Sequence, residues 1–367
     1  MKIAVLLSGG VDSSVALRLL QQQGHDVTAF YLKIWLQDEF SFLGDCPWEE
    51  DLEFARGVCE QAGVKLEVLP LQDEYWAKVV SYTISEIKAG RTPNPDMYCN
   101  RLIKFGDFYD KIDPMYEKVA SGHYGLIEEK EGKHLLKISP DPIKDQTYFL
   151  AYVTPPQLKR ALFPLGHYDK KQIRQFAKEF DLPNQIRKDS QGICFLGKIK
   201  FNDFVKFHLG ELKGDIINID EMKKVGEHQG YYYFTIGQRQ GIKLHGGPWY
   251  VVKKDHINNI IYISRNKELL EVKRNSFYVR NINWIAGEPT DKKELRLKIR
   301  HGARFFNCRL DLLNELDGLV TIDGFDRGIA PGQFAVFYDG EYCLGGGSIE
   351  NDVPVESESE LVNADVK

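Results

Sequence analysis

Residues 2–14, KIAVLLSGGVDSS, join an apolar run, a pair of glycines and the start of a periodic segment. The run at 2–8 is typical of a buried strand, and the residues from Ser13 onward have helical periodicity. Glycines let the backbone turn tightly and approach a ligand closely. Because a helix start offers unpaired N–H groups and a positive dipole end, this loop favours an anion.

Two familiar nucleotide loops do not fit this stretch. The GK[ST] ending of a Walker A loop is missing, and the glycines do not follow G-x-G-x-x-G. Ser8, Ser13 and Ser14 add hydroxyl donors, whereas Asp12 would repel a phosphate unless a magnesium ion bridges the two. The alternative is an ordinary strand–turn–helix unit with an acidic N-cap.

Strand and helix patterns alternate through the rest of the first half. Further strands are expected at 26–35, 65–71 and 116–124, and helices at 13–24, 51–62 and 73–89. This order is typical of a parallel, Rossmann-type α/β sheet with crossover helices, in which loops at the strand ends carry the chemistry.

The pattern changes after about residue 150. A helix at 170–183 and a loop at 189–197 precede short, alternating strands from about 215 to 350. We expect a small β-rich middle module and a C-terminal β-barrel. The predicted domains are 1–205, 206–273 and 274–352, followed by a polar tail at 353–367.

The composition is that of a globular protein, with 43% hydrophobic and 28% charged residues among 367. No run of eighteen apolar residues and no signal-peptide pattern is present, so we expect a cytosolic protein. The net charge is −5, but 159–200 holds ten Lys and Arg against four acids, and 291–309 seven against two. Such local basic surfaces favour a docked polyanion; a solvated helix face is the alternative.

Cys99 lies in AGRTPNPDMYCN (89–100), a polar stretch rich in turn residues. Pro93 and Pro95 stiffen the approach, and Asn94 or Asp96 can cap a helix that begins near Met97. Cys99 would then lie in the first turn, where the helix dipole favours thiolate and makes it a nucleophile candidate. The alternative is a cysteine that merely packs under the loop.

Cys194 lies in RKDSQGICFLG (187–197), where Arg187 and Lys188 also favour thiolate. The cysteines stand at 46, 59, 99, 194, 308 and 343 and form no C-x-x-C pair, which argues against a zinc ribbon. Two cysteines in polar glycine/proline loops suggest sulfur chemistry. One thiol would carry a persulfide, and the other would attack the resulting intermediate and form a disulfide.

SGGVDS resembles the PP-loop of N-type ATP pyrophosphatases, enzymes with the adenine nucleotide alpha hydrolase-like fold that split ATP into AMP and pyrophosphate. The whole chain resembles the bacterial tRNA-specific 2-thiouridylases (MnmA type). The motifs that carry this resemblance occur in the family's order: SGGVDSS, AGRTPNPDMYCN, SGHY, KDQTYFL, DSQGICF, GEHQGYYYFTIGQRQGI, PWYVV and PGQFAVFYDGEYCLGGGSI. The cysteine spacing separates the chain from tRNA-thiolating enzymes with paired C-x-x-C zinc sites.

The resemblance implies the ATP and tRNA sites residue by residue. The implied ATP-binding residues are Leu6, Leu7, Ser8, Gly9, Gly10, Val11, Asp12, Ser13, Leu32 and Gly122, with Asp12 also a catalytic residue that holds Mg2+ with ATP. Leu32 stands where the family often has methionine. His123 is either a proton donor or a buried, hydrogen-bonded histidine, and we leave it out of the catalytic set.

The implied contacts with the target base are Asn94, Pro95 and Asp96, whose polar groups suit the edge of a uridine splayed out of the anticodon loop. Lys144, Asp145 and Gln146 match a tRNA-contacting segment, and Arg300 and His301 match an Arg-Tyr pair that contacts tRNA. His301 departs from that tyrosine.

The implied reaction is the 2-thiolation of the wobble uridine of tRNA. ATP adenylates O2 of the base, a persulfide on Cys194 delivers sulfur to C2, and Cys99 completes the transfer as nucleophile, which leaves a Cys99–Cys194 disulfide. Either the Cys194 persulfide attacks the base directly, or Cys99 first releases hydrosulfide. Cys46, Cys59, Cys308 and Cys343 are taken as structural.

The implied partners are a tRNA with a wobble uridine and a sulfur-relay protein or cysteine desulfurase, with no membrane, and a monomer is favoured. Two other functions are compatible with parts of the pattern. One is a PP-loop ligase that adenylates a small carboxylate or purine without sulfur. The other is an RNA-binding module with a relic nucleotide site.

Overall fold

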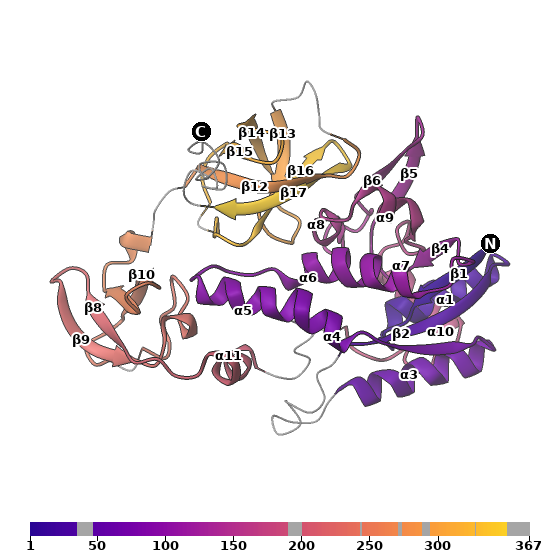
Figure 1. Ribbon diagram of the computed structural model, residues 1–367, viewed down its shortest axis with the longest axis horizontal. Helices are drawn as coiled ribbons and strands as arrows, with labels where there is room; N and C mark the ends of the chain where they lie inside the picture. Colours follow the sequence, from indigo (N-terminus) through magenta and orange to yellow (C-terminus); the bar gives the residue numbers. More distant parts are fainter. Residues whose placement is uncertain are drawn as a thin grey trace, which may run out of the picture.

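The computed structural model describes residues 1–34, 47–189, 200–242, 244–270, 274–287, 294–326 and 328–350. Figure 1 shows three bodies: a sheet flanked by helices near the N-terminus, a small sheet at the left and a barrel at the top. The predicted fold class is therefore confirmed. The limits predicted at 205/206 and 273/274 stay a prediction.

The N-terminal sheet is parallel, in the order β3-β2-β1-β4-β7. Its central strand is buried on both faces, because Ile3 and Val5 belong to one apolar cluster and Ala4 and Leu6 to another. The two-residue strand β7 was not predicted, since it is too short to show a period. The strands are β1 (Lys2–Leu6), β2 (Asp26–Lys33), β3 (Leu66–Pro70), β4 (Lys118–Ala120) and β7 (Ala161–Leu162).

Helices connect and cover these strands. The single helices are α1 (Val11–Gln22), α3 (Pro47–Ala62), α8 (Thr147–Leu150), α9 (Pro155–Arg160), α10 (Lys170–Glu179) and α11 (Phe201–Leu209). Two longer runs change to π-type hydrogen bonding partway. They are α4 (Gln72–Tyr75), η2 (Trp76–Val80) and α5 (Ser81–Lys88), then α6 (Pro95–Tyr98), η3 (Cys99–Asp107) and α7 (Phe108–Lys111).

The middle module is a four-stranded sheet in the order β10-β11-β8-β9, in which only the β11–β8 pair is parallel. Its apolar face packs on Tyr231, Phe234 and Trp249. Its elements are β8 (Gly214–Asn218), β9 (Lys223–His228), η4 (Tyr231–Tyr233), β10 (Tyr250–Asp255), β11 (Ile260–Ser264) and η5 (Lys267–Leu270).

The C-terminal strands close into a barrel in the order β12-β15-β14-β13-β16-β17, because β17 also pairs with β12. Along β14 buried and exposed residues alternate, which is the period-2 pattern seen in the sequence. The strands are β12 (Ser276–Trp284), β13 (Glu294–Lys298), β14 (Phe306–Leu312), β15 (Gly318–Ile322), β16 (Phe334–Asp339) and β17 (Tyr342–Glu350).

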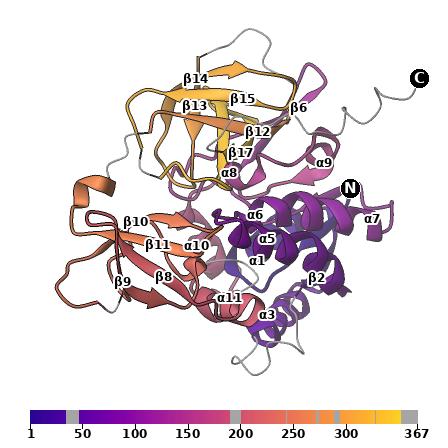
Figure 2. The same cartoon turned by 60° about the vertical axis from the view of Figure 1, so that its left-hand side comes forward.

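A hairpin of the first predicted domain joins this barrel sheet. β5 (Leu126–Lys130) and β6 (Lys133–Lys137) form the hairpin, and β6 pairs with β17 through Leu136 and Cys343. One apolar cluster also contains residues of both bodies, such as Tyr148 and Phe334. The barrel and the N-terminal domain are thus fused by a common core, and Figure 2 shows the barrel lying over the helical run that contains α6. Among the described residues, no helix is both long and apolar enough to cross a bilayer.

Candidate active site

The glycine loop turns from β1 into α1, as the sequence predicts. Gly9 has a φ of +74°, and a Cβ there would lie 2.2 Å from the carbonyl oxygen of Asp51. Only glycine fits both conditions. Gly10 is the N-cap of α1, so the first N–H groups of the helix lack intrahelical partners at this loop.

The serine hydroxyls mainly hold the loop itself. Ser13 Oγ donates to Gly10 O at 3.0 Å and lies 3.2 Å from Ser8 Oγ, and Ser14 Oγ donates to Gly10 O at 2.9 Å. Ser13 and Ser14 are buried, while Ser8 is exposed. Of the three predicted hydroxyl donors, Ser8 is the one open to a ligand.

Two residues distant in sequence donate hydrogen bonds to a carbonyl oxygen of the loop. Asn184 Nδ2 donates to Gly9 O at 2.8 Å and to Ser14 Oγ at 2.9 Å. Arg187 donates to Gly9 O at 3.1 Å and pairs with Asp51. The loop is therefore fixed before any ligand arrives.

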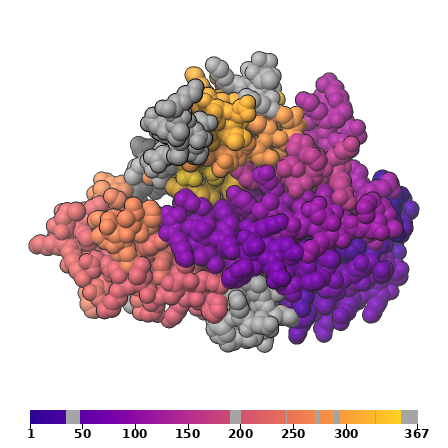
Figure 3. Space-filling view, in the orientation of Figure 1, coloured from indigo at the N-terminus to yellow at the C-terminus, as the bar shows by residue number. Residues whose placement is uncertain are grey.

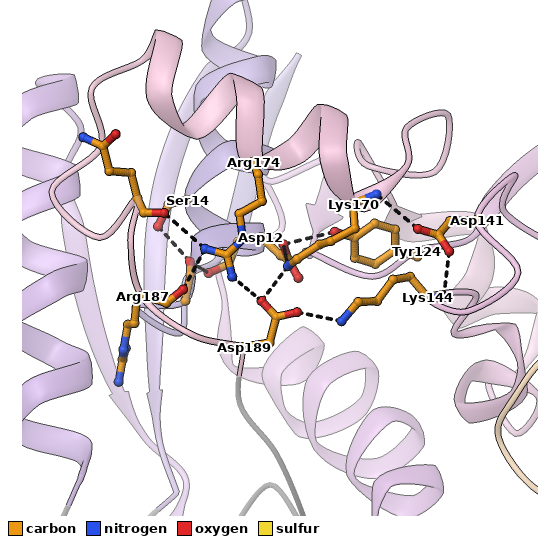
Figure 4. A network of polar contacts seen from close by, with 12 residues as sticks. Asp12, Ser14, Tyr124, Asp141, Lys144, Lys170, Arg174, Arg187 and Asp189 are labelled. Atoms are coloured by element: carbon orange, nitrogen blue, oxygen red, sulfur yellow. Dashed lines mark hydrogen bonds and ion pairs between the residues drawn. The ribbon is translucent and has the colours of Figure 1, made fainter.

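A network of ion pairs lies beside the loop (Figure 4). Lys170 Nζ joins two carboxylates, Asp12 at 2.6 Å and Asp189 at 2.8 Å. Asp189 also pairs with Lys144 and Arg174, each at 2.6 Å. Burial alone would raise the pKa of Asp189, but the hydrogen bonds and charges of Lys144 and Lys170 outweigh it and hold the pKa at about 2. The network places three cations within reach of the anion site.

Sequence reasoning did not single out Lys170, Arg174 or Asp189 as site residues. The signal was present in part, because Lys170 and Arg174 are four residues apart on α10 and so share one helix face. They also belong to the basic run at 159–200. What the sequence did not show is that α10 packs against α1, which brings this face to the glycine loop.

The loop after β4 contacts the start of α1. A Cβ on Gly122 would lie 2.8 Å from Ser13 N, so this glycine permits the approach. Tyr124 OH donates to Asp12 Oδ1 at 3.1 Å, and burial together with the Asp12 charge raises the pKa of Tyr124. Leu32 lies two residues beyond Phe30, which pairs with Leu6, and therefore stands at the same sheet edge.

Three of the predicted ATP-binding residues are core residues. Leu6, Leu7 and Val11 are buried, so only their backbone faces the loop. His123 is half-buried, its Nδ1 lies 2.7 Å from Ser121 Oγ, and desolvation lowers its pKa well below the usual range. Its hydrogen bond to Ser121 fits the second of the two alternatives.

Asn94 is the N-cap of α6, and Pro95 occupies the first helical position. Cys99 begins the π-type stretch that follows and is only 2% exposed, within the apolar cluster that contains Met97 and Ile103. Although its neighbours in sequence are polar, the helix turns the Cys99 side chain inward, which fits the alternative of a cysteine packed under the loop. Its role as nucleophile stays a prediction.

Lys144, Asp145 and Gln146 reach three different parts of the molecule. Lys144 pairs with Asp189, whereas Gln146 Oε1 accepts from Tyr124 N at 3.0 Å. Asp145 is 2% exposed and pairs with Lys298 of the barrel at 2.8 Å. The side chain of Asp145 is thus occupied by the protein itself, and tRNA contact by these residues stays a prediction.

Arg300 and His301 occupy the barrel surface next to this segment. Arg300 makes a two-pronged pair with the buried Asp326, at 3.0 and 3.1 Å, and its side chain is 51% exposed. His301 Nε2 lies 3.0 Å from Asp145 O, and its ring stacks on Phe149 at 4.8 Å. Desolvation lowers the pKa of His301.

Cys194 and Cys46 lie outside the described residues, and so does any Cys99–Cys194 bond. Cys59, Cys308 and Cys343 are buried, and burial raises their pKa values to about 11, 12 and 12. Such thiols are inert near neutral pH, which fits the structural role predicted for them. In the described part of the chain, no group of three or more His, Cys, Asp or Glu is arranged to hold a metal.

Three family profiles match the chain in succession. They are the tRNA methyl transferase HUP domain at residues 1–198, the tRNA methyl transferase PRC-barrel domain at 202–265 and the aminomethyltransferase beta-barrel domain at 274–349. The three profiles follow the order of the three bodies of the fold, although the β5–β6 hairpin within the first profile joins the barrel sheet.

Curated relatives match over nearly the full length. The tRNA-specific 2-thiouridylase MnmA of Parabacteroides distasonis is 43% identical over 355 residues, 95% of this chain and 99% of that protein. The tRNA-specific 2-thiouridylase MnmA 2 of Bacteroides fragilis strain YCH46 is 46% identical over 356 residues, 95% and 100% of the two chains. Among solved structures, the U34-tRNA thiolase NcsA of Methanococcus maripaludis shares 17% identity at a TM-score of 0.34, covering 57% of this chain and 68% of that one.

Proposed function

This chain belongs to the family of tRNA-specific 2-thiouridylases, and we propose that it catalyses the ATP-dependent 2-thiolation of the wobble uridine of tRNA anticodons. One structural observation supports the proposal most directly. Lys170 joins Asp12 of the glycine loop to Asp189, which stands five residues before Cys194. One ion-pair network therefore includes both the proposed ATP site and Asp189, which precedes the proposed sulfur-carrying segment.

In the first step, uridine O2 attacks the α-phosphorus of ATP, and pyrophosphate leaves. The start of α1, with the exposed Ser8 hydroxyl, binds phosphate oxygens. Lys170 pairs with Asp12, and Arg174 pairs with Asp189. In this step the two cations also bind the leaving pyrophosphate and stabilise its charge. The base then carries AMP on O2, which is a far better leaving group than oxide.

Magnesium fits this loop through one carboxylate. Mg2+ prefers oxygen ligands and usually keeps phosphate oxygens and waters around it. Asp12 is placed at the helix start, so this residue would link the ion to the protein. Bound there, Mg2+ would neutralise charge on the phosphates.

Sulfur transfer uses two thiols. A sulfur-relay protein or cysteine desulfurase loads Cys194 with a persulfide, whose outer sulfur attacks C2 and displaces AMP. The Cys99 thiolate then attacks the Cys194 sulfur, which breaks the S–S bond, leaves sulfur on the base and forms a Cys99–Cys194 disulfide. In the other order, Cys99 first displaces hydrosulfide, which attacks C2. Both orders consume one persulfide and need a dithiol reductant to reopen the disulfide.

Incubation with ATP, Mg2+, a persulfide donor and unmodified tRNA tests the proposal, with AMP and 2-thiouridine measured together. Wild-type protein should yield the two products in equal amounts. Cys99→Ser and Cys194→Ser should each stop thiolation while the protein stays folded. Normal thiouridine formation by either variant would overturn the two-thiol mechanism. Release of AMP at the same rate with and without tRNA would favour another PP-loop ligase.

A further inference from the structure

The backbone of residues 88–94 leads from the end of α5 to Asn94, the first residue proposed to contact the target base. The first turn after α5 relies on Gly90, which has a φ of +74°. Arg91 pairs with Glu86 of the same domain, and further contacts of this segment come from the other two bodies. Figure 3 shows the salmon-coloured middle module and the yellow barrel lying against the purple residues of this region.

The middle module holds the beginning of the segment. Tyr231 OH donates a hydrogen bond to the carbonyl oxygen of Lys88. A Cβ added to Gly90 would lie 3.0 Å from Cβ and Cγ of His256, so the module packs closely on the turn itself. The end of α5 is thereby fixed from one side.

The barrel holds the end of the segment. Thr92 N donates to Pro331 O at 2.8 Å. Gln333 Nε2 donates to Thr92 O and to Pro93 O, each at 3.2 Å. One side-chain amide therefore holds two successive carbonyls immediately before Asn94.

The barrel turn that supplies these contacts is itself anchored. Gly332 N donates to Ile349 O at 2.9 Å, and Ile349 N donates to Gln333 O at 2.7 Å, so the turn moves with β17. A Cβ on Gly332 would lie 2.8 Å from Thr92 O, which shows how closely the two backbones approach. The position of Asn94 is thus linked to the body of the barrel.

We propose that Gln333 is a positioning residue of the active site, which fixes Asn94, Pro95 and Asp96 where the target uridine must be held. The inference rests on the proposed function of those three residues. It gives the barrel a second role beside tRNA contact, because the turn at 331–333 completes the base site from outside the N-terminal domain. A fault in this turn should therefore lower kcat more than it raises the KM for tRNA.

Gln333→Leu removes the amide with little change in size, and Gln333→Glu places a carboxylate beside the same two carbonyls. Gln61 offers a matched control, because its Nε2 also donates to two successive carbonyls, Phe180 O at 3.1 Å and Asp181 O at 2.8 Å. Loss of two ordinary hydrogen bonds predicts a fall in kcat for 2-thiouridine of about tenfold for both Gln333 variants. The KM for tRNA should rise by less than about threefold, and the affinity for ATP should stay unchanged. The control variants Gln61→Leu and Gln61→Glu should match wild type.

Hydrogen–deuterium exchange on the protein alone gives a readout independent of activity. Amides of the 88–98 peptide should exchange about tenfold faster in the Gln333 variants than in wild type or the Gln61 variants. Unchanged exchange there would overturn the inference, as would a kcat equal to wild type, or a defect confined to the KM for tRNA. A wild-type protein without thiolation activity would instead refute the proposed function, and the exchange result would still stand by itself.

Discussion

The glycine loop and residues 88–94 are both turns at functional ends of the N-terminal domain, but they are held in different ways. Gly9 O accepts from Asn184 and Arg187, and Asp12 pairs with Lys170, so the supports of the glycine loop belong to the same domain. Residues 88–94 have one ion pair within their own domain, Arg91–Glu86, but they also depend on Tyr231 of the middle module and on Gln333 of the barrel.

This difference separates two tasks of the enzyme. The proposed nucleotide end is held within the N-terminal domain, by hydrogen bonds of serine and Asn184 and by ion pairs. The proposed base end has one ion pair of its own domain, Arg91–Glu86, and is completed by two other domains through hydrogen bonds between uncharged groups. Damage to the barrel should therefore reach the base end and leave the nucleotide end intact, and the reverse should hold for damage to the ion-pair network.

The largest effect is expected for Lys298→Met, which tests whether damage to the barrel leaves ATP binding unchanged. Lys298 and Asp145 are each 2% exposed and pair at 2.8 Å across the junction of barrel and N-terminal domain. Removing one partner leaves a buried charge, which should lower the free energy of unfolding by about 3–5 kcal/mol. Denaturant unfolding measures the loss. At a temperature where the variant is folded, thiolation should fall while ATP affinity stays unchanged.

Adding Asp145→Asn to Lys298→Met controls for the unpaired charge. The double variant should recover part of the lost stability, because the amide buries more easily than a carboxylate. No recovery would mean that the contacts of Lys298 Nζ with the rings of Phe305 and Tyr338, rather than the ion pair, hold the junction.

Lys170→Met tests the proposed nucleotide end. It removes the cation that joins Asp12 and Asp189 and that is proposed to receive pyrophosphate. AMP release should fall about 100-fold, the size expected for one preorganised charge at a reacting phosphate. Binding of tRNA should stay within about twofold of wild type. Steady-state kinetics and filter binding give the two values.

The neighbouring Lys171 serves as the control, because it is exposed on the same helix. Lys171→Met should retain the activity of wild type. An equal loss in both variants would show that the general basicity of α10, and not the position of Lys170, is what matters.

Acid should weaken the ion-pair network around Asp189. The pKa of Asp189 lies at about 2, below its unfolded value of 3.8, so its stabilisation is present above pH 4 and is lost as the pH falls toward 2. The loss should amount to roughly 1–2 kcal/mol. Unfolding measured between pH 4 and 2 should show a shallower pH dependence in Asp189→Asn than in wild type, and equal slopes would contradict this.

The parts of the fold that were predictable from sequence depend on local signals. β1, the glycine turn and α1 follow from an apolar run, two glycines and a 3.6-residue period within 21 residues. The alternating burial of β14 likewise repeats its sequence pattern. The family resemblance then supplied the residue roles, which the geometry of single elements does not contain.

What sequence reasoning missed depends on contacts between distant residues. The hairpin β5–β6 joins the barrel sheet through the pairing of Leu136 with Cys343 of β17. The local hydrophobic pattern of either strand does not reveal that pairing. Cys99 was judged by its polar neighbours, but Asn100 is itself buried, with its amide donating to Phe149 O at 3.0 Å. A polar residue can be buried when it hydrogen-bonds to a residue distant in sequence, and the sequence alone does not reveal that partner.

The smallest expected effect tests whether both outer domains act on the base end. Tyr231→Phe removes the hydrogen bond to Lys88 O and keeps the ring in its apolar cluster. Loss of one such bond costs about 0.5–1.5 kcal/mol, so kcat should fall roughly two- to tenfold. The expected fall is no larger than that for Gln333→Leu, because Lys88 lies farther from Asn94 than Thr92 and Pro93 do along the chain.

Tyr232→Phe is the matched control, since its hydroxyl donates to Gly210 O at 2.9 Å and, within the part of the chain that the structure describes, to no residue of 88–94. If kcat falls only in Tyr231→Phe, the middle module shares the positioning of the base end with the barrel. If both tyrosine variants keep the kcat of wild type while Gln333→Leu loses it, the base end is set by the barrel alone. The middle module would then have no part in positioning residues 88–94, and only the barrel would link them to the rest of the molecule.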